Sequence, residues 1–497
     1  MDPTVLGFPL WVRLTHFFDI LFLTLLIRSG IEILGAHPML YWNDACRPGS
    51  EWVRFTPKRM PADELWTAED EKQPYSPLIA LPGRDNLGLG RYWHFTAVAG
   101  WILTGVIYVI LLFTSAQWQR LIPTSWEVFP QAAQAALGYL QLHPPAAGNP
   151  YNALQQLTYF GVVFVLSPLQ IATGLAMSPA VAGRFPWYTR LFGGRQAARS
   201  IHFLGMVAFV VFVVHHTALV FAHGIALGLG EMVLGLTRQP TPEETAVAVA
   251  IAILGLTAVV LVHIWATHRS LTEPRRMQNQ LQPLVDAWQR VLLQPLRSRQ
   301  AYPGAAITRV PRPNGRAPHD PEWQRLAAGG FEDFHLEVSG LVEHPLTLTL
   351  DDLRALAPTT QVTRHVCIQG WTQVVRWGGV PLGVLLERAR PLPGAQFVLF
   401  RTFDDKWEHD GEHPYFYGTI GLDLARRPQS ILAYDMNGEV LPAAFGAPLR
   451  VRFESQLGYK MTKWVRSIEL IADYRTIGAG KGGWREDELN YSQIAPI

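Results

Sequence analysis

A chain of 497 residues exceeds the size of one ordinary domain, so at least two structural units are expected. Its 42 Lys and Arg residues nearly balance its 40 Asp and Glu residues, which argues against a nucleic-acid partner and against an acidic substrate. The uneven distribution of hydrophobic residues is therefore the first guide to the organisation of the chain.

Five long apolar stretches lie before residue 270, and none follows: 10–34, 95–112, 157–177, 203–226 and 246–265. A bilayer core of about 30 Å needs about 20 apolar residues in a helix, and each stretch is near that length. The first stretch is too long for a signal peptide, so we expect it to stay in the protein. We predict an α-helical transmembrane domain at 1–270, a linker at 271–330 and a second domain at 331–497.

Positive charge is distributed unequally between the two sides of the predicted bundle. Seventeen Lys and Arg residues follow the first, third and fifth stretches, on one side of the membrane. Only Arg13, Arg120 and Arg238 lie on the other side. Since cytoplasmic loops are enriched in Lys and Arg, this asymmetry predicts an outside N-terminus and a cytoplasmic C-terminal domain.

Histidines lie in or at the ends of these stretches, where ionisable residues are rare and usually functional. They are His16, His94, His202, His215, His216, His223 and His263. The 14 residues from His202 to His216 turn a helix by about 1400°, which is about 40° short of four turns, so these two share one face. His215 points elsewhere, and His263 is assigned to packing or to the edge of a haem.

The depth of these histidines predicts two haem sites. The second and fourth stretches begin on the same side of the membrane, so His94 and His202 lie at a similar depth. The first stretch begins on the opposite side, and His16, near its start, lies at the depth of His216. Each pair can bind one b-type haem iron through two imidazoles. The alternatives are that some of these histidines only bond to neighbouring helices, and that His223 replaces His216.

This histidine arrangement resembles the cytochrome b subunit of formate dehydrogenase and nickel-iron hydrogenase, over roughly residues 8–268. The resemblance implies two b haems in a multi-pass protein of the bacterial inner membrane, surrounded by lipid. It also implies quinone or quinol exchange coupled to a second redox centre.

The remainder of the chain has the pattern of a soluble α+β domain. Strand-like runs at 334–342, 395–403, 430–435 and 463–471 are separated by short helical patterns such as 381–389. The Asn437-Gly438 pair between two apolar runs predicts a hairpin. The linker is rich in Pro, Arg and Gln, with one amphipathic surface helix expected around 281–296.

The two cysteines, Cys46 and Cys367, form no C-x-x-C motif, which disfavours iron–sulfur clusters and structural zinc. A disulfide between them fits poorly with a cytoplasmic loop, so each is interpreted alone. Cys367 lies in the run Thr-Arg-His-Val-Cys-Ile-Gln-Gly-Trp, which Trp-Gly-Gly-Val-Pro-Leu follows. A lone buried cysteine is most often inert, so a functional role for Cys367 has to be judged from the residues around it.

The segment around Cys367 resembles the molybdopterin domain of the sulfite oxidase and methionine sulfoxide reductase family. The match runs over about 334–472 and includes Phe-Arg-Thr-Phe, Gly-Ala-Pro-Leu-Arg and Gly-Tyr-Lys-Met-Thr-Lys-Trp. The resemblance implies a molybdenum–molybdopterin cofactor, with Cys367 as the thiolate ligand of the metal. It implies a pterin contact for Thr402 and places Gly446, Arg450, Lys460 and Lys463 around the cofactor phosphate.

Two departures limit what the resemblance implies. Phe445 stands before the Gly-Ala-Pro run, where the family has asparagine or histidine. Only about 25 residues follow the last predicted strand, so the dimerisation domain of sulfite oxidases is missing and the oligomeric state stays open. Arg364 is our candidate for attracting a substrate oxygen; its alternative role is a salt bridge that supports the loop.

Together, the two halves predict a membrane-bound molybdenum oxidoreductase that connects the quinone pool, through two haems, to a small oxo-transfer substrate. A quinol-fed reductase of an S- or N-oxide is preferred. The alternatives are a sulfite-type oxidase that delivers electrons to quinone, and a haem electron carrier whose C-terminal domain only binds a ligand.

Overall fold

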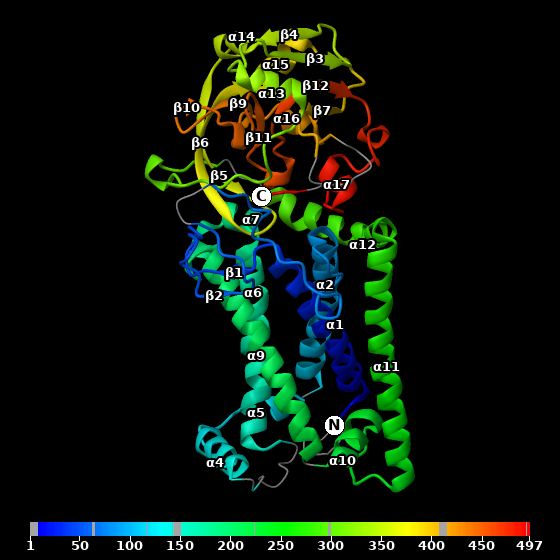
Figure 1. Ribbon diagram of the computed structural model, residues 1–497. Helices are drawn as coiled ribbons and strands as arrows, with labels where there is room; N and C mark the ends of the chain where they lie inside the picture. The colour runs from blue at the N-terminus through cyan, green and yellow to red at the C-terminus, as the bar shows by residue number, and fades with distance from the viewer. Residues whose placement is uncertain are drawn as a thin grey trace.

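The computed structural model describes residues 8–61, 65–115, 117–141, 143, 151–222, 224–296, 300–406, 415–493 and 495–497. A bundle of long helices forms one end of the molecule, and a β-rich C-terminal domain is seated on the other end of that bundle (Figure 1). The N-terminal end of the described chain lies at the far end of the bundle, away from this domain (Figure 1). The predicted α-helical membrane domain followed by an α+β domain is confirmed.

The bundle consists of five long helical segments: α1 (Leu10–Gly35), α2 (Leu87–Thr114), α5 with η1 and α6 (Ala153–Met177), α9 (Arg195–Ala222) and α11 (Pro242–Thr272). In the third segment, α5 (Ala153–Phe160), the π-helical η1 (Gly161–Leu166) and α6 (Ser167–Met177) follow without a break. All of these segments except α1 are long and apolar enough to cross a membrane, which makes four.

Helix α1 is the fifth segment that we predicted, and it differs from the others in its charged residues. It carries Arg13, Asp19, Arg28 and Glu32 within 26 residues. Three of these bond inside the protein: Arg13 donates to the Val233 carbonyl at 2.8 Å, Arg28 contacts His263 at 2.8 Å, and Glu32 accepts from the Asn86 amide at 2.6 Å. Such pairing lowers the cost of placing charge in a helix bundle.

Helix α2 begins eight residues before its predicted start. The Asn86 side chain accepts the Leu89 amide at 3.0 Å and caps the helix, and Glu32 accepts the Asn86 and Gly83 amides. These bonds start the helix above its apolar run, so its first two turns reach the C-terminal domain.

Short elements connect the helices at both ends of the bundle. On the far side they are α3 (Trp118–Leu121), α4 (Val128–Leu140), α10 (Ile225–Leu229) and η2 (Gly230–Leu234). On the side of the C-terminal domain they are β1 (Met39–Leu40), β2 (Val53–Arg54), α7 (Pro179–Arg184) and α8 (Pro186–Arg190). The amphipathic helix expected at 281–296 begins earlier, as α12 (Pro274–Trp288), and continues through η3 (Gln289–Leu293) and η4 (Gln294–Leu296). It lies between bundle and domain (Figure 1).

The C-terminal domain contains two five-stranded sheets. One has the order β4-β3-β12-β7-β8, in which only β3 and β12 are parallel; the other has the order β10-β9-β6-β5, with β11 paired to β9. The strands are β3 (His335–Gly340), β4 (Leu346–Thr349), β5 (Thr359–Val366), β6 (Thr372–Pro381), β7 (Phe397–Thr402), β8 (Tyr417–Gly421), β9 (Ser430–Met436), β10 (Glu439–Val440), β11 (Arg450–Phe453) and β12 (Val465–Ile471). Buried side chains from both sheets, among them Val338, Phe400, Leu432, Val451 and Ile468, form its main core.

Helices and turns complete this domain. They are η5 (Gly304–Ala306), α13 (Pro321–Ala328), α14 (Leu350–Ala355), α15 (Leu382–Ala389), α16 (Leu422–Ala425), η6 (Ala443–Phe445), η7 (Gly458–Lys460), η8 (Tyr474–Thr476) and α17 (Trp484–Glu488). The predicted hairpin is present, because Met436 pairs with Glu439 across Asn437 and Gly438. Both turn residues have positive φ, 57° and 94°, which explains the Asn-Gly pair.

The second part of the predicted linker belongs to the C-terminal domain in space. Trp323 and Leu326 of α13 are buried in the domain core, and the Trp323 indole donates to the Ala447 carbonyl at 2.9 Å. The segment before α13 also follows the domain, since the Tyr302 amide bonds to the Val362 carbonyl and the Thr308 amide to the Val374 carbonyl. Because this segment is rich in Pro and has no helix or strand periodicity, its contacts with the domain could not be predicted from the sequence.

The bundle and the C-terminal domain share a buried apolar cluster. Cys46, Ala68 and Leu87 from the first long loop and the start of α2 pack with Cys367 and Trp371. Burial of this apolar surface stabilises the docking of the domain on the bundle. The first loop and the end of the third helical segment therefore lie on the side of the C-terminal domain, as the parity of five segments requires.

Candidate functional site

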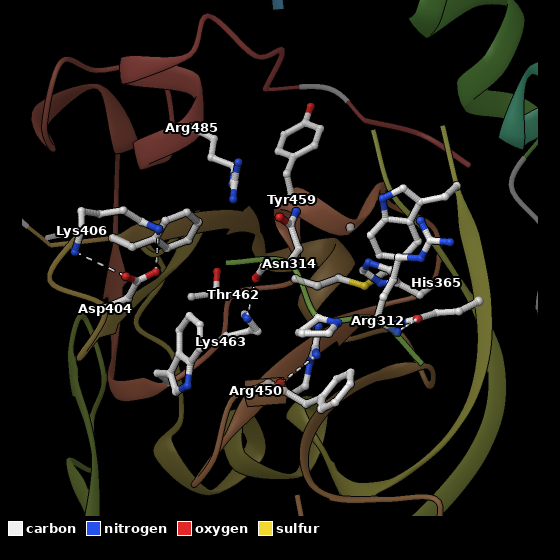
Figure 2. A pocket seen from close by; sticks show the side chains of 18 residues that line it. Arg312, Asn314, His365, Asp404, Lys406, Arg450, Tyr459, Thr462, Lys463 and Arg485 are labelled. Carbon is white, nitrogen blue, oxygen red and sulfur yellow. Dashed lines mark hydrogen bonds and ion pairs between the residues drawn. The ribbon is translucent and has the colours of Figure 1, made fainter. Parts of the chain in front are cut away.

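A cavity in the C-terminal domain gathers an excess of positive charge. Arg312, Lys406, Arg450, Lys463 and Arg485 line it, and Asp404 is the one carboxylate among the described lining residues. Figure 2 shows Lys406 and Asp404 at one end, Arg312 and His365 at the other, and Arg450 with Lys463 between them. A hollow lined in this way is suited to a ligand that carries negative charge.

Arg450 and Lys463 form the centre of this positive wall. The Arg450 guanidinium donates to the Phe445 carbonyl at 2.8 Å, and the Lys463 ammonium donates to the Asn314 carbonyl at 2.6 Å. Burial, together with the charge of Arg450, holds the pKa of Lys463 well below its usual range. In the described part of the chain, both buried cations donate hydrogen bonds to carbonyls and lie over indole rings, and neither is paired with a carboxylate. They therefore fit a phosphate, which would stabilise both charges.

Gly446 makes the close approach of these two cations possible. Its φ is +120°, a conformation that favours glycine, and a Cβ there would lie 3.0 Å from the Cβ of Lys463 and 3.1 Å from that of Arg450. A larger residue would push apart the backbone that carries both charges.

Cys367 lies beside the cavity, in the turn that joins β5 to β6. Its amide donates to the Trp371 carbonyl at 3.0 Å, and its sulfur lies 3.9 Å from the Asn314 side-chain nitrogen, a group that lines the cavity. Burial raises the pKa of the Cys367 thiol to about 12. A thiol of this kind becomes a thiolate only with a strong local cation, such as a bound metal.

Several buried polar atoms of the cavity wall have no hydrogen-bond partner within the described part of the chain. They are Asn314 Oδ1, Arg450 Nε and Thr462 Oγ1. Buried polar atoms in proteins are nearly always satisfied, so these atoms fit a ligand with many polar edges. A phosphate site, unpaired donors and acceptors, and a neighbouring cysteine together fit a molybdenum–molybdopterin cofactor.

Three further residues that we singled out from the sequence do not line the cavity. The Thr402 hydroxyl donates to the Phe416 carbonyl at 2.6 Å and accepts the Asp404 amide at 3.1 Å, so it supports two lining residues. Lys460 forms a buried ion pair with Glu486. Arg364 lies outside the cavity, with its guanidinium 5.6 Å from the ring centre of Tyr302.

Other residues of the wall were not singled out from the sequence. Arg312 and Asn314 come from the predicted linker, and Arg485 comes from the C-terminal segment. His365, two residues before Cys367, bonds to the Arg452 guanidinium at 2.9 Å. Burial, together with the charge of Arg452, holds the pKa of His365 well below its usual range, so this ring is neutral.

Within the bundle, His94 on α2 and His202 on α9 each have Nδ1 within hydrogen-bond distance of a hydroxyl from a neighbouring helix. The His94 Nδ1 lies 3.1 Å from the Ser29 hydroxyl, and the His202 Nδ1 lies 3.0 Å from the Thr173 hydroxyl. A hydrogen bond to Nδ1 fixes a ligand histidine and leaves Nε2 for the metal. α2 and α9 both begin next to the C-terminal domain, so this pair lies on its side (Figure 1).

His16 on α1 and His216 on α9 lie together nearer the far side of the bundle. Their ring centres are 6.3 Å apart. Two imidazoles that bind one metal at nitrogen distances of about 2 Å have ring centres about 6 Å apart. The Phe212 ring stacks on His216 at 5.5 Å, and the Tyr159 hydroxyl lies 3.4 Å from its Nδ1. This pair can hold a haem iron from two sides.

The remaining candidate histidines have other surroundings. His215 is exposed on the bundle surface, with Nδ1 bonded to the Val211 carbonyl at 2.9 Å. His263 has both ring nitrogens engaged, by Thr24 at 2.9 Å and by Arg28 at 2.8 Å, which fits a packing role. His223, the alternative to His216, lies outside the described residues.

Comparisons with known proteins agree with this division of the chain. A family model described as oxidoreductase molybdopterin binding domain matches residues 325–476, and one described as prokaryotic cytochrome b561 matches residues 7–235. The putative protein-methionine-sulfoxide reductase subunit YedZ1 of Azospira oryzae is 34% identical over 41% of this chain and 69% of its own length. The catalytic subunit MsrP of protein-methionine-sulfoxide reductase from Ralstonia nicotianae is 34% identical over 28% of this chain and 44% of its own length.

A solved structure, the sulfane dehydrogenase SoxCD of Paracoccus pantotrophus, is similar over 30% of this chain and 42% of its own. The identity over this region is 24%, and the TM-score is 0.26.

The fold, the site and these matches define a membrane-bound oxidoreductase with a cytochrome b domain and a molybdopterin domain on one chain. Within that class, this chain belongs to the family of the YedZ1 subunit, and the same chain carries the region that the molybdopterin binding domain model matches. It matches less than half of the length of MsrP.

Proposed function

We propose that this enzyme is a quinol-fed reductase of an S- or N-oxide, with two b haems between His94 and His202 and between His16 and His216. The observation that supports this function is the order of the sites. One histidine pair lies near the far side of the bundle, a second lies on the side of the C-terminal domain, and the cavity beside Cys367 follows in the docked domain.

The residues around the cavity have separate roles in this proposal. Arg450 and Lys463 would hold the cofactor phosphate, and Cys367 would hold the metal. When bound, the molybdenum cofactor supplies two-electron oxo transfer. The apolar cluster around Cys367 would limit water beside the metal ligand.

The overall reaction balances as follows. A quinol loses two electrons and two protons; the sulfoxide takes up two electrons and two protons, its S–O bond breaks, and the oxygen leaves as water. Arg364 lies outside the cavity, so any effect that it has on a substrate oxygen acts over a distance. The sulfite-type oxidase would run electrons in the opposite direction, from the metal to quinone.

The direction of electron flow decides between these functions. We expect the haems of the purified full chain, reduced with a short-chain quinol, to be reoxidised by methionine sulfoxide or trimethylamine N-oxide. Sulfite should leave the oxidised haem spectrum unchanged. Haem reduction by sulfite would establish the oxidase instead, and loss of both reactions in a molybdenum-replete protein would establish the electron carrier.

We also propose that the C-terminal domain lies in the cytoplasm, because the loops on its side carry most of the Lys and Arg residues. A fluorescent reporter that folds only in the cytoplasm, fused after Ile497, is expected to fluoresce. Alkaline phosphatase fused at the same position is expected to be inactive. An active phosphatase fusion would mean an inverted bundle and substrates outside the cytoplasm.

A further inference from the structure

The face of the C-terminal domain that carries Cys367 is covered by the membrane domain. Cys367 is only 3% exposed, and it packs in one apolar cluster with Cys46 and Ala68 of the first long loop. Gln196, at the start of α9, donates to the Gly370 carbonyl at 2.9 Å, three residues after the cysteine. The Cys367 turn therefore lies in an interface and not on an open surface.

A short part of the first loop, residues 65–72, fastens this cover; we call it the clamp segment. The Ala68 amide donates to the Pro313 carbonyl at 3.2 Å, and the Ala68 carbonyl accepts from the Gln369 side chain at 3.2 Å. Ala68 thus ties together the cavity wall at Pro313 and the turn after Cys367. Both bonds use the backbone of a residue that is completely buried, so this part of the loop is in direct contact with the domain.

Ion pairs hold the clamp segment at the two residues that follow Ala68. Asp70 pairs with Arg316 at 2.8 Å, and Glu69 lies 3.7 Å from Arg485, which lines the cavity. The Asp70–Arg316 pair is exposed and contributes little by itself, whereas Arg485 of the second pair is buried. Both pairs add to the buried backbone contact of Ala68.

Arg312 connects the clamp segment to the inside of the cavity. Its guanidinium lies between two indoles, 4.6 Å from the Trp66 ring centre and 5.1 Å from that of Trp371. It donates to the Cys46 carbonyl at 2.7 Å and lies 3.5 Å from the buried Glu71 carboxylate. Cys46, Trp66 and Glu71 of the first loop therefore hold Arg312 in place. This side of the cavity depends on contacts from the membrane domain.

We infer that this enzyme acts on small, free oxo compounds and excludes methionine sulfoxide within proteins, because its own membrane domain covers the face through which a polypeptide would approach Cys367. A sulfoxide in a protein brings neighbouring backbone with it, and that backbone would have to displace the clamp segment. A free molecule carries no such backbone and does not have to displace this segment. This inference rests on the proposed reductase function and narrows its substrate class.

The test is a size series on the full-chain holoenzyme with quinol-reduced haems. The oxidants are free methionine sulfoxide, a blocked tripeptide with a central methionine sulfoxide, and oxidised casein. We expect kcat/KM for haem reoxidation to fall along the series and to be at least about 100-fold lower for casein, since a misplaced reacting group costs about that much. We also expect free methionine sulfoxide, but not oxidised casein, to shift the Mo(V) electron paramagnetic resonance signal.

Variants of the clamp segment separate its role from that of substrate chemistry. Ala68→Arg should force the segment away from Pro313 and Gln369 and raise kcat/KM for the tripeptide relative to free methionine sulfoxide. Amide hydrogen exchange at 312–316 and 367–371 should rise in this variant while the haem spectrum stays unchanged. If Ala68→Arg fails to fold, the Glu69→Ala/Asp70→Ala double variant gives a smaller change in the same direction. Arg59→Ala, an exposed change in the same loop, is the matched control and should behave as wild type.

Reduction of oxidised casein by the wild type with a kcat/KM close to that for free methionine sulfoxide would overturn the inference but leave the reductase function intact. Unchanged size selectivity in both clamp variants, together with raised exchange, would overturn the role of the clamp segment. If no S- or N-oxide reoxidises the haems, the proposed function fails, and this inference fails with it.

Discussion

Replacing Cys367 by Ser is expected to abolish turnover of the oxo substrate, by a factor of roughly 10³ or more, because the proposed sulfur ligand of the metal is lost. Haem content should stay at the wild-type value, since the candidate haem ligands lie on α1, α2 and α9 and not in the C-terminal domain. Substrate-driven haem reoxidation gives the activity, molybdenum analysis gives the metal content, and the pyridine haemochrome gives the haem content.

Cys46→Ser is the matched control. Cys46 is also a free, buried cysteine in the same interdomain cluster, and burial likewise raises its pKa to about 12. Only its carbonyl bonds to Arg312, and serine keeps that group. We expect this variant to retain activity. Equal activity in Cys367→Ser and wild type would refute Cys367 as the metal ligand.

The parts of the fold that could be predicted from the sequence are those with a local cause. Strands β7 and β9 follow their β-branched and aromatic runs, and the Asn437-Gly438 turn requires two positive φ values that few other pairs adopt. The long helices follow their apolar length. Their ends were predicted less well, because the start of α2 depends on Glu32, which is distant in the sequence.

The candidate site was only partly predictable, for a related reason. Cys367, Gly446, Arg450 and Lys463 lie in short motifs, and the structure brings them together around one cavity or directly beside it. Arg312 and Asn314 reach the same cavity from a Pro-rich segment without periodicity. Their position depends on Trp66 and Ala68, about 245 residues earlier in the chain, and no local pattern encodes such a contact.

Charged residues near the contact between the bundle and the C-terminal domain are paired inside the protein. Arg28 and Glu32 end α1 with internal partners, and Arg312 rests between aromatic rings and the Glu71 carboxylate. The Arg312 contacts join the C-terminal domain to the first loop, and so they help to fix the position of this domain on the bundle. A fixed position would keep the distance between a haem and the metal constant during turnover. Two separate subunits would have to dock again to restore that distance.

His202→Ala is expected to remove one of two haems and to stop electron delivery to the C-terminal domain, because His202 belongs to the pair nearer that domain. Its ring is held by the Thr173 hydroxyl, which leaves Nε2 for iron, whereas the His215 ring is exposed and bonds to its own helix. His215→Ala is therefore the matched control on α9, and it should keep both haems and full activity.

The pyridine haemochrome per protein should fall by about half in His202→Ala, as expected for two sites with two imidazoles each. Quinol should still reduce the remaining haem, but the oxo substrate should no longer reoxidise it at the wild-type rate. An unchanged haem content in His202→Ala would refute the pairing with His94, and haem loss in His215→Ala would mean that the facing of α9 had been assigned to the wrong histidine.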